Sequence, residues 1–217
     1  DLSSKRLINL LYNYEYINSS SKEADKKKLD FIIYFHIQRI LFDFNSKKIS
    51  EFTSYDLKAY LLSCSLLKKI NETEIDYIKY IVDNQIDKIG MHKSYNFLEH
   101  SKFINNLSEI KNILLFFNSK KSNIFDEVIL KMTSILNEYF HLDGTVALFN
   151  GTNNVYTINI YNSLNKESYL KKREFSNINN GIAFYSDKNK KIFFDVVQPN
   201  SDMISSNLSA GTLSVEL

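Results

Sequence analysis

The sequence predicts an α+β multidomain protein in which a helical domain precedes an antiparallel β-region. Apolar residues recur every three or four positions through most of residues 3–141, as they do in amphipathic helices. Beyond residue 142, short segments alternate apolar and polar residues, which is typical of half-buried strands. We therefore expect a helical domain over residues 1–142 and a β-domain over residues 143–217.

Six helices joined by short polar turns are predicted in the first region, and they favour antiparallel pairs stacked as a bundle, solenoid or toroid. Cap residues support several starts: Thr53 or Ser54 for the third helix, and Asn71 or Thr73 for the fourth. The expected ranges are residues 6–17, 29–44, 54–67, 73–86, 97–118 and 122–141.

The second helix is apolar around most of its circumference, so it is expected to be largely buried, with His36 as a hydrogen-bonded core residue. Cys64 lies on an apolar face and is interpreted as a buried, inert thiol. His141 ends the sixth helix, where a cation suits the helix dipole.

The second region begins at the turn signal Asp143-Gly144 and contains five predicted strands, two of them joined as a hairpin by residues 187–190. The strands are expected at residues 146–149, 155–161, 182–186, 192–197 and 212–217. About 75 residues hold too few strands to close a sandwich. Because the chain also lacks an initiator Met and ends within a strand, we expect a piece of a longer protein, incomplete at both ends.

The bulk composition excludes some classes of partner. The formal net charge is only +2, and the basic clusters at residues 26–28 and 171–173 are short enough to be solvated faces, so no nucleic-acid partner is expected. No apolar run is long enough to insert into a membrane. No metal-ligand spacing and no Gly-rich phosphate loop are present, so neither a metal nor a cofactor is expected. The sequence does not set the oligomeric state.

The polar stretch QIDKIGMHKSYNFLEH, residues 85–100, is the candidate functional site. Gly90 is expected to end the preceding helix in a left-handed conformation, and Asn96 to cap the next helix. In that geometry His92, Tyr95 and His100 converge on a groove, where histidine and tyrosine are able to transfer protons. A structural interpretation is also open: His92 as a capping residue and His100 as a solvent-facing one.

Three motifs of the chain resemble the alphaproteobacterial branch of the heparinase II/III-like family. In the first motif, the matching residues are Gln85, Ile86, Gly90, His92, Ser94 and Asn96. The segment HLDGTVALFNGT, residues 141–152, resembles the family's domain junction. The final segment SAGTLSVEL, residues 209–217, resembles one of its strands.

The resemblance implies an incomplete (α/α) toroid followed by an antiparallel β-sandwich, with an acidic polysaccharide or oligosaccharide as ligand. It also implies cleavage of uronate-containing glycans by β-elimination, in a periplasmic or cell-envelope location, although a cytoplasmic one stays open. Elimination requires a neutralised carboxylate, a base and an acid. His92, Tyr95 and Asn96 are the catalytic candidates that the resemblance implies, and Ser94, Glu99 and His100 are the substrate-binding candidates.

Two departures from the family pattern leave other functions open. Glu99 stands where lyase members carry a tyrosine, and Ser209 stands where a histidine is expected. These positions favour an alternative in which a glycan-binding or envelope protein keeps the fold without catalysis. A helical-repeat interaction module with an appended β-domain is a third possibility.

Overall fold

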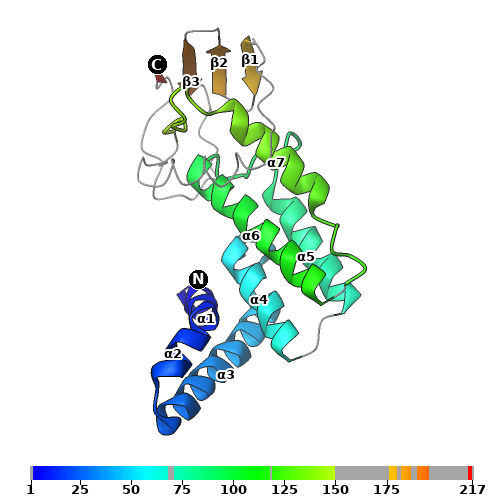
Figure 1. The fold of residues 1–217 in the computed structure, drawn as a ribbon. Coiled ribbons are helices and arrows are strands. Elements are labelled where there is room, and N and C mark those ends of the chain that lie inside the picture. The colour runs from blue at the N-terminus through cyan, green and yellow to red at the C-terminus, as the bar shows by residue number, and fades with distance from the viewer. Residues whose placement is uncertain are drawn as a thin grey trace. The chain divides into compact units, whose positions relative to one another are not determined.

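The computed structural model of this chain describes residues 2–67, 71–117, 119–149, 176–179, 182–186, 190–195 and 215–216. Over these residues the protein is mostly helical, with one small antiparallel sheet (Figure 1). The contacts divide the chain into two units, each of which combines two segments. The first unit is Asp1–Gln85 with Asn105–Asp126, and the second is Ile86–Ile104 with Glu127–Leu217. The predicted domain boundary at residue 142 stays a prediction.

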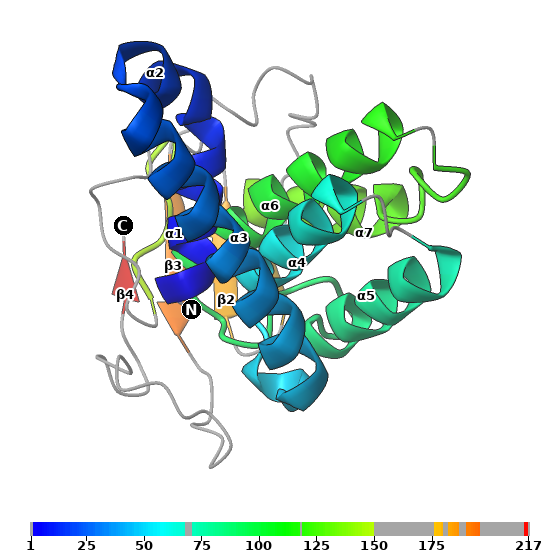
Figure 2. The same ribbon diagram turned by 90° about the horizontal axis from the view of Figure 1, so that it is seen from below.

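The first unit is built from helices whose apolar sides face one another. In this unit α1 packs against α3 and α4, and α3 packs against α4 (Figure 2). The elements that contribute to the unit are α1 (Leu2–Tyr12), α2 (Tyr14–Ser20), α3 (Glu23–Ser46), the 3₁₀ turn η1 (Ile49–Glu51), α4 (Ser54–Leu66), α5 (Glu72–Gln85) and the second part of α6 (Phe97–Phe116).

The predicted helix over residues 6–17 is two helices, so that prediction is wrong in detail. Asn13 separates α1 from α2, with φ −103° and ψ 10°. Its side-chain Nδ2 donates to the carbonyl oxygen of Asn9 at 2.8 Å. The backbone hydrogen bonds from Asn13 to Asn9 and from Ile17 to Asn13 persist, so the break is confined to the backbone angles at Asn13.

Helix α3 is not largely buried, contrary to the sequence prediction. One stripe faces the unit's core: Leu29, Ile33, Ile37, Ile40 and Phe44. The opposite face leaves Phe31 69%, Phe35 57% and Phe42 75% exposed. His36 is also not a hydrogen-bonded core residue, because it is partly exposed and its Nδ1 has no hydrogen-bond partner among the described residues. Burial, with the nearby cations Arg6 and Arg39, lowers the pKa of His36.

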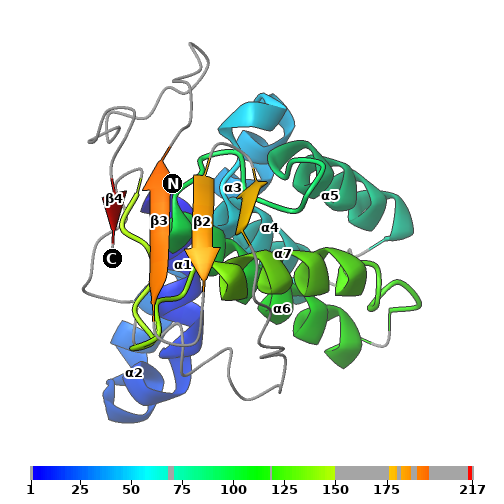
Figure 3. The same ribbon diagram turned by 90° about the horizontal axis from the view of Figure 1, so that it is seen from above.

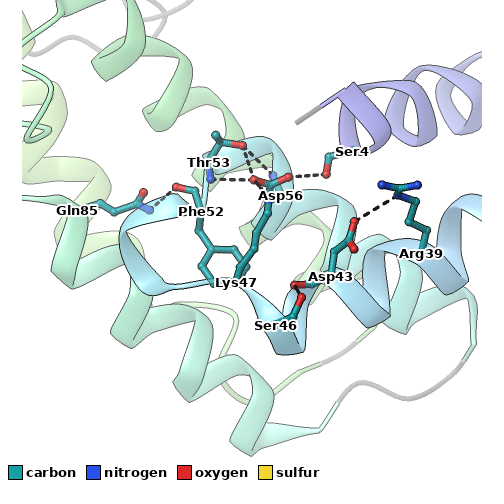
Figure 4. A network of polar contacts seen from close by, with 9 residues as sticks. All are labelled: Ser4, Arg39, Asp43, Ser46, Lys47, Phe52, Thr53, Asp56 and Gln85. Atoms are coloured by element: carbon teal, nitrogen blue, oxygen red, sulfur yellow. Dashed lines mark hydrogen bonds and ion pairs between the residues drawn. The ribbon is translucent and has the colours of Figure 1, made fainter. Parts of the chain in front are cut away.

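The start of α4 is the most strongly connected polar cluster of the first unit (Figure 4). Thr53 is the N-cap, as predicted, and it forms a capping box with Asp56. The Asp56 carboxylate also accepts from Ser4 Oγ at 2.6 Å and from Lys47 Nζ at 2.8 Å. This single carboxylate therefore links α1, the residue after α3 and the start of α4.

Two further predictions hold in the first unit. Asn71 caps α5, because its Oδ1 accepts the backbone N–H of Glu74 at 2.8 Å. Cys64, the one cysteine of the sequence, is buried as predicted and only 3% exposed.

The second unit contains the start of α6, most of α7 and a four-stranded antiparallel sheet (Figure 3). The strands follow chain order across the sheet. Tyr139 packs against Phe97, Phe184 and Phe193, with ring centroids 4.7–6.1 Å apart, so aromatic side chains form this unit's core. The elements are α7 (Asp126–Glu138), β1 (Ser176–Asn179), β2 (Ile182–Ser186), β3 (Lys191–Asp195) and β4 (Val215–Glu216).

The strand predictions had mixed outcomes. The strand at residues 182–186 and its antiparallel partner from residue 191 are confirmed, with Ser186 opposite Lys191. Residues 146–149 do not form a strand: only Val146 makes a bridge, to Phe140. Residues 155–161 lie outside the described residues. Of residues 212–217, the structure describes two, Val215 and Glu216, which form one short strand.

The sixth predicted helix is shorter than expected at both ends, because residues 121–125 form turns and α7 stops at Glu138. His141 therefore does not end a helix. It starts a turn in which its N–H donates to the Thr145 carbonyl at 2.7 Å. The Asp143-Gly144 turn signal is confirmed, since Asp143 Oδ1 accepts the Thr145 N–H at 2.9 Å and Gly144 has φ 83°.

Candidate functional site

The candidate site is the connection after α5, residues 86–96, together with the first turns of α6; all of it belongs to the second unit. An antiparallel bridge joins Ile86 to His92 and closes the connection into a loop. Inside the loop, the Asp87 N–H donates to the Met91 carbonyl at 2.9 Å. The loop is therefore tied together by its own backbone.

Asp87 organises this loop, and the sequence analysis missed it. Its Oδ1 accepts three backbone N–H groups, from Ile89 at 3.0 Å, Gly90 at 2.9 Å and Met91 at 2.8 Å. Aspartate side chains that bond to the backbone just ahead of them are typical of turns, and a glycine three residues later supports a turn. The Asp87-Lys-Ile-Gly90 pattern is the signal that would have found it.

Gly90 adopts the expected left-handed conformation but does not end a helix, since α5 ends at Gln85. Its φ is +105°, which strains any residue with a side chain. A Cβ at this position would lie 2.7 Å from Cγ of Lys131 on α7. Lys131 Nζ in turn donates to the Lys88 carbonyl at 2.5 Å. Glycine is thus required both by the backbone and by the close approach of α7.

His100 is a buried connector and neither faces solvent nor lines a groove. Its side chain is 0% exposed. Its Nε2 lies 2.9 Å from the Met132 carbonyl oxygen, and its Nδ1 accepts the backbone N–H of His92 at 3.1 Å. Burial lowers the pKa of His100 from 6.5 to about 4, so the ring is neutral at neutral pH. The expectation that His100 binds substrate has no physical basis in this position.

His92 is partly buried and also neutral. Its Nδ1 lies 2.8 Å from Ser94 Oγ and accepts the Ser94 N–H at 3.2 Å. Its ring packs against Phe103, with the centroids 4.9 Å apart. Burial lowers the pKa of His92 to about 4, and the nearby Glu99 opposes that shift only in part. His92 is therefore not a cation that neutralises a substrate carboxylate at neutral pH.

Tyr95 and Asn96 complete the turn into α6. Tyr95 has φ 50°, an uncommon conformation for a residue other than glycine. Its hydroxyl points to Asp87 Oδ2 at 3.4 Å, and burial and this carboxylate raise the pKa of Tyr95. Tyr95 therefore stays protonated and is not a base. Asn96 caps α6 as predicted, since its Oδ1 accepts the Glu99 N–H at 3.0 Å.

Glu99 is the exposed member of the predicted set. It lies in the first turn of α6 and forms an ion pair with Lys102, with an N···O distance of 2.6 Å. Lys102 offsets the charge of Glu99 at the surface, so the pair presents no net charge at the start of α6.

The described residues lack two other features, a metal-binding cluster and a membrane-spanning helix. No group of three or more His, Cys, Asp or Glu side chains able to hold a metal ion occurs in this part of the chain. Within the same described ranges, every helix is either too short or too polar to cross a membrane.

The chain was also compared with known proteins. Comparisons with models of protein families, with curated proteins and with solved structures gave no match. The resemblance to the heparinase II/III-like family therefore remains an expectation from three sequence motifs, and Ser209, in the last of them, lies outside the described residues.

Proposed function

We propose that this chain binds an acidic, uronate-containing glycan through the loop at residues 86–96 and the start of α6, without cleaving it. The single observation that carries this proposal is the protonation of the two residues expected to transfer protons. His92 is neutral, with a pKa of about 4, and the pKa of Tyr95 is raised. Neither group supplies the carboxylate-neutralising charge or the strong base that β-elimination requires.

The ligand class comes from the resemblance, and the loop's chemistry is compatible with it. Sugars present many hydroxyl and carboxylate oxygens, and hydrogen-bond donors on a pre-formed loop bind them at a lower ordering cost than donors on a flexible loop. His92, Ser94 and Tyr95 are partly exposed in this loop. The proposal also includes the fold that the resemblance implies, an (α/α) toroid followed by a β-sandwich.

A polysaccharide lyase is the second candidate, and one observation favours it. The Tyr95 hydroxyl keeps its proton and lies beside Asp87, as a general acid for a leaving glycosidic oxygen should. This reading needs a base from another part of the protein.

Incubation with uronate polymers separates the two candidates. The purified chain is mixed with alginate, polygalacturonate, hyaluronan and heparin, and with dextran as a neutral control. We expect retention on at least one uronate polymer, no retention on dextran, and no unsaturated product absorbing in the ultraviolet. Product formation that His92→Ala abolishes would establish the lyase instead. Absence of binding to every uronate polymer would overturn both proposals.

A further inference from the structure

The hydrogen bonds around His100 determine where its proton lies. A carbonyl oxygen only accepts hydrogen bonds, so His100 Nε2, 2.9 Å from the Met132 oxygen, must carry a proton. The neutral ring then has a bare Nδ1, and this nitrogen accepts the His92 N–H at 3.1 Å. His100 therefore fastens the backbone of His92 to α7 from inside the second unit's core.

The same reasoning assigns the proton of His92. A backbone N–H only donates, so His92 Nδ1, which the Ser94 N–H approaches at 3.2 Å, must be bare. The Ser94 hydroxyl, 2.8 Å away, then donates to this nitrogen as well, while Ser94 Oγ accepts the Asn96 N–H at 3.3 Å. The ring proton of His92 consequently lies on Nε2, and no described residue hydrogen-bonds to that atom.

We propose that Ser94 and His100 are positioning residues for His92: Ser94 holds the ring as one neutral tautomer and His100 holds the backbone, so that the Nε2–H group donates a hydrogen bond to an oxygen of the bound glycan. The identity of the ligand rests on the proposed function. The tautomer does not, because it is a property of the ligand-free chain. Burial lowers the pKa of His92, which agrees with a ring that stays neutral in this arrangement.

Nitrogen NMR of histidine side chains tests the tautomer directly. The chain contains four histidines, and comparison with His92→Gln identifies the His92 signals. We expect a single neutral tautomer with the proton on Nε2, unchanged between about pH 6 and pH 8. A proton on Nδ1, or a cationic ring in that range, would overturn the proposal.

Substitution of Ser94 tests the positioning role. In Ser94→Ala we expect a mixture of His92 tautomers and an affinity for the uronate polymer lower by about 3- to 10-fold, the value of one neutral hydrogen bond. Ser94→Thr keeps the hydroxyl and should restore both readings. The matched control is Ser134→Ala, because Ser134 is exposed on α7 and its hydroxyl bonds only within its own helix, to the Leu130 carbonyl.

The tautomer of His92 and the affinity for the uronate polymer are measured separately, so this inference is tested apart from the function on which it rests. A single Nε2–H tautomer that persists in Ser94→Ala would overturn the positioning role of Ser94, whatever the affinity does. Failure of every uronate polymer to bind would overturn the proposed function and the ligand contact, while the spectra would still decide the tautomer. Folding is checked for each variant by the signals of the other three histidines.

Discussion

Two aspartates, one in each unit, gather hydrogen bonds in different ways. Asp56 is 4% exposed and accepts from Ser4, Lys47 and Thr53, which are up to 52 residues away in sequence. Asp87 is partly exposed and accepts backbone N–H groups from residues 89–91, all within four positions. The first pattern ties helices together, whereas the second shapes one loop.

The comparison also separates structural from functional polarity. Ser4, Lys47 and Thr53 donate to the buried Asp56 carboxylate, as Figure 4 shows, so the hydrogen bonds of this cluster are made within the protein. The loop around Asp87 instead ends in partly exposed polar side chains, among them His92 and Tyr95. We therefore expect substitutions in the first cluster to change stability and substitutions in the loop to change binding.

The largest expected effect is that acid destabilises the two units in different pH ranges. His92 and His100 have pKa values of about 4 in the folded chain and an ordinary value of 6.5. Between these values the unfolded chain takes up protons that the folded chain does not. The free energy of unfolding of the second unit should therefore be highest above about pH 6.5 and fall by about 3 kcal/mol per histidine toward pH 4.

Asp56 should act at lower pH. Burial alone would raise its pKa, but the hydrogen bonds from Lys47, Ser4 and Thr53 outweigh burial and lower it. Its stabilisation is present above its ordinary pKa of 3.8 and is lost as the pH falls below that value. Urea unfolding followed from pH 8 to pH 3 tests both statements. If His100→Gln left the slope between pH 6.5 and pH 4 unchanged, the assignment to the histidines would be contradicted.

Replacement of the buried carboxylate should have the next largest effect. Asp56→Ala removes the capping box of α4 and the ion pair with Lys47, so we expect a loss of about 3 kcal/mol in urea unfolding. The control Asp43→Asn removes a more exposed pair with Arg39, whose side chain is 58% exposed, and should cost less than about 1 kcal/mol. Equal losses would show that the Asp56 cluster has no special role.

Gly90→Ala should destabilise the loop by about 2 kcal/mol, because the new Cβ meets Lys131 and the φ of +105° is strained. The double variant Gly90→Ala with Lys131→Ala separates the two causes. The stability of the double variant is compared with that of Lys131→Ala alone. The difference should be smaller than the loss caused by Gly90→Ala in the original chain, because only the steric part of that loss is removed. A Gly90→Ala chain as stable as the original would contradict the loop geometry described here.

The smallest effect on stability, and the clearest on binding, is expected for His92→Ala. Loss of one ligand hydrogen bond should lower the affinity for a uronate polymer by about tenfold, with a change in unfolding free energy below about 1 kcal/mol. The control is His36→Gln in the first unit, where the ring is partly exposed on α3. Similar affinities for the two variants would place the site elsewhere.

Local signals in the sequence predicted much of the fold. Thr53, Asn71 and Asn96 were recognised as helix caps because a cap depends on a side chain and the backbone two or three residues ahead. Apolar spacing also located the helices and the strand at residues 182–186. These features depend on neighbours in sequence.

The errors concern properties that depend on distant contacts. An apolar helix such as α3 exposes Phe31 and Phe42 because only one of its sides meets α1 and α4, and periodicity does not reveal which neighbours exist. His100 was expected to line a groove or to face solvent, and both predictions are wrong because the residue is buried against Met132, 32 residues away. The connection between helices expected at this stretch is confirmed between α5 and α6, but the role of Asp87 was not predicted because its partners are backbone groups.

The dependence of ligand affinity on pH tests the central claim, a neutral histidine in a binding loop, most directly. A uronate carboxylate is ionised throughout the range from about pH 5.5 to pH 8, and a neutral His92 would also not change its charge there. Titration calorimetry with a retained uronate oligosaccharide should therefore give the same dissociation constant at both ends of this range. An affinity that weakens about tenfold as the pH rises from 5.5 to 8, and that becomes independent of pH in His92→Ala, would show that His92 binds as a cation and would contradict the account.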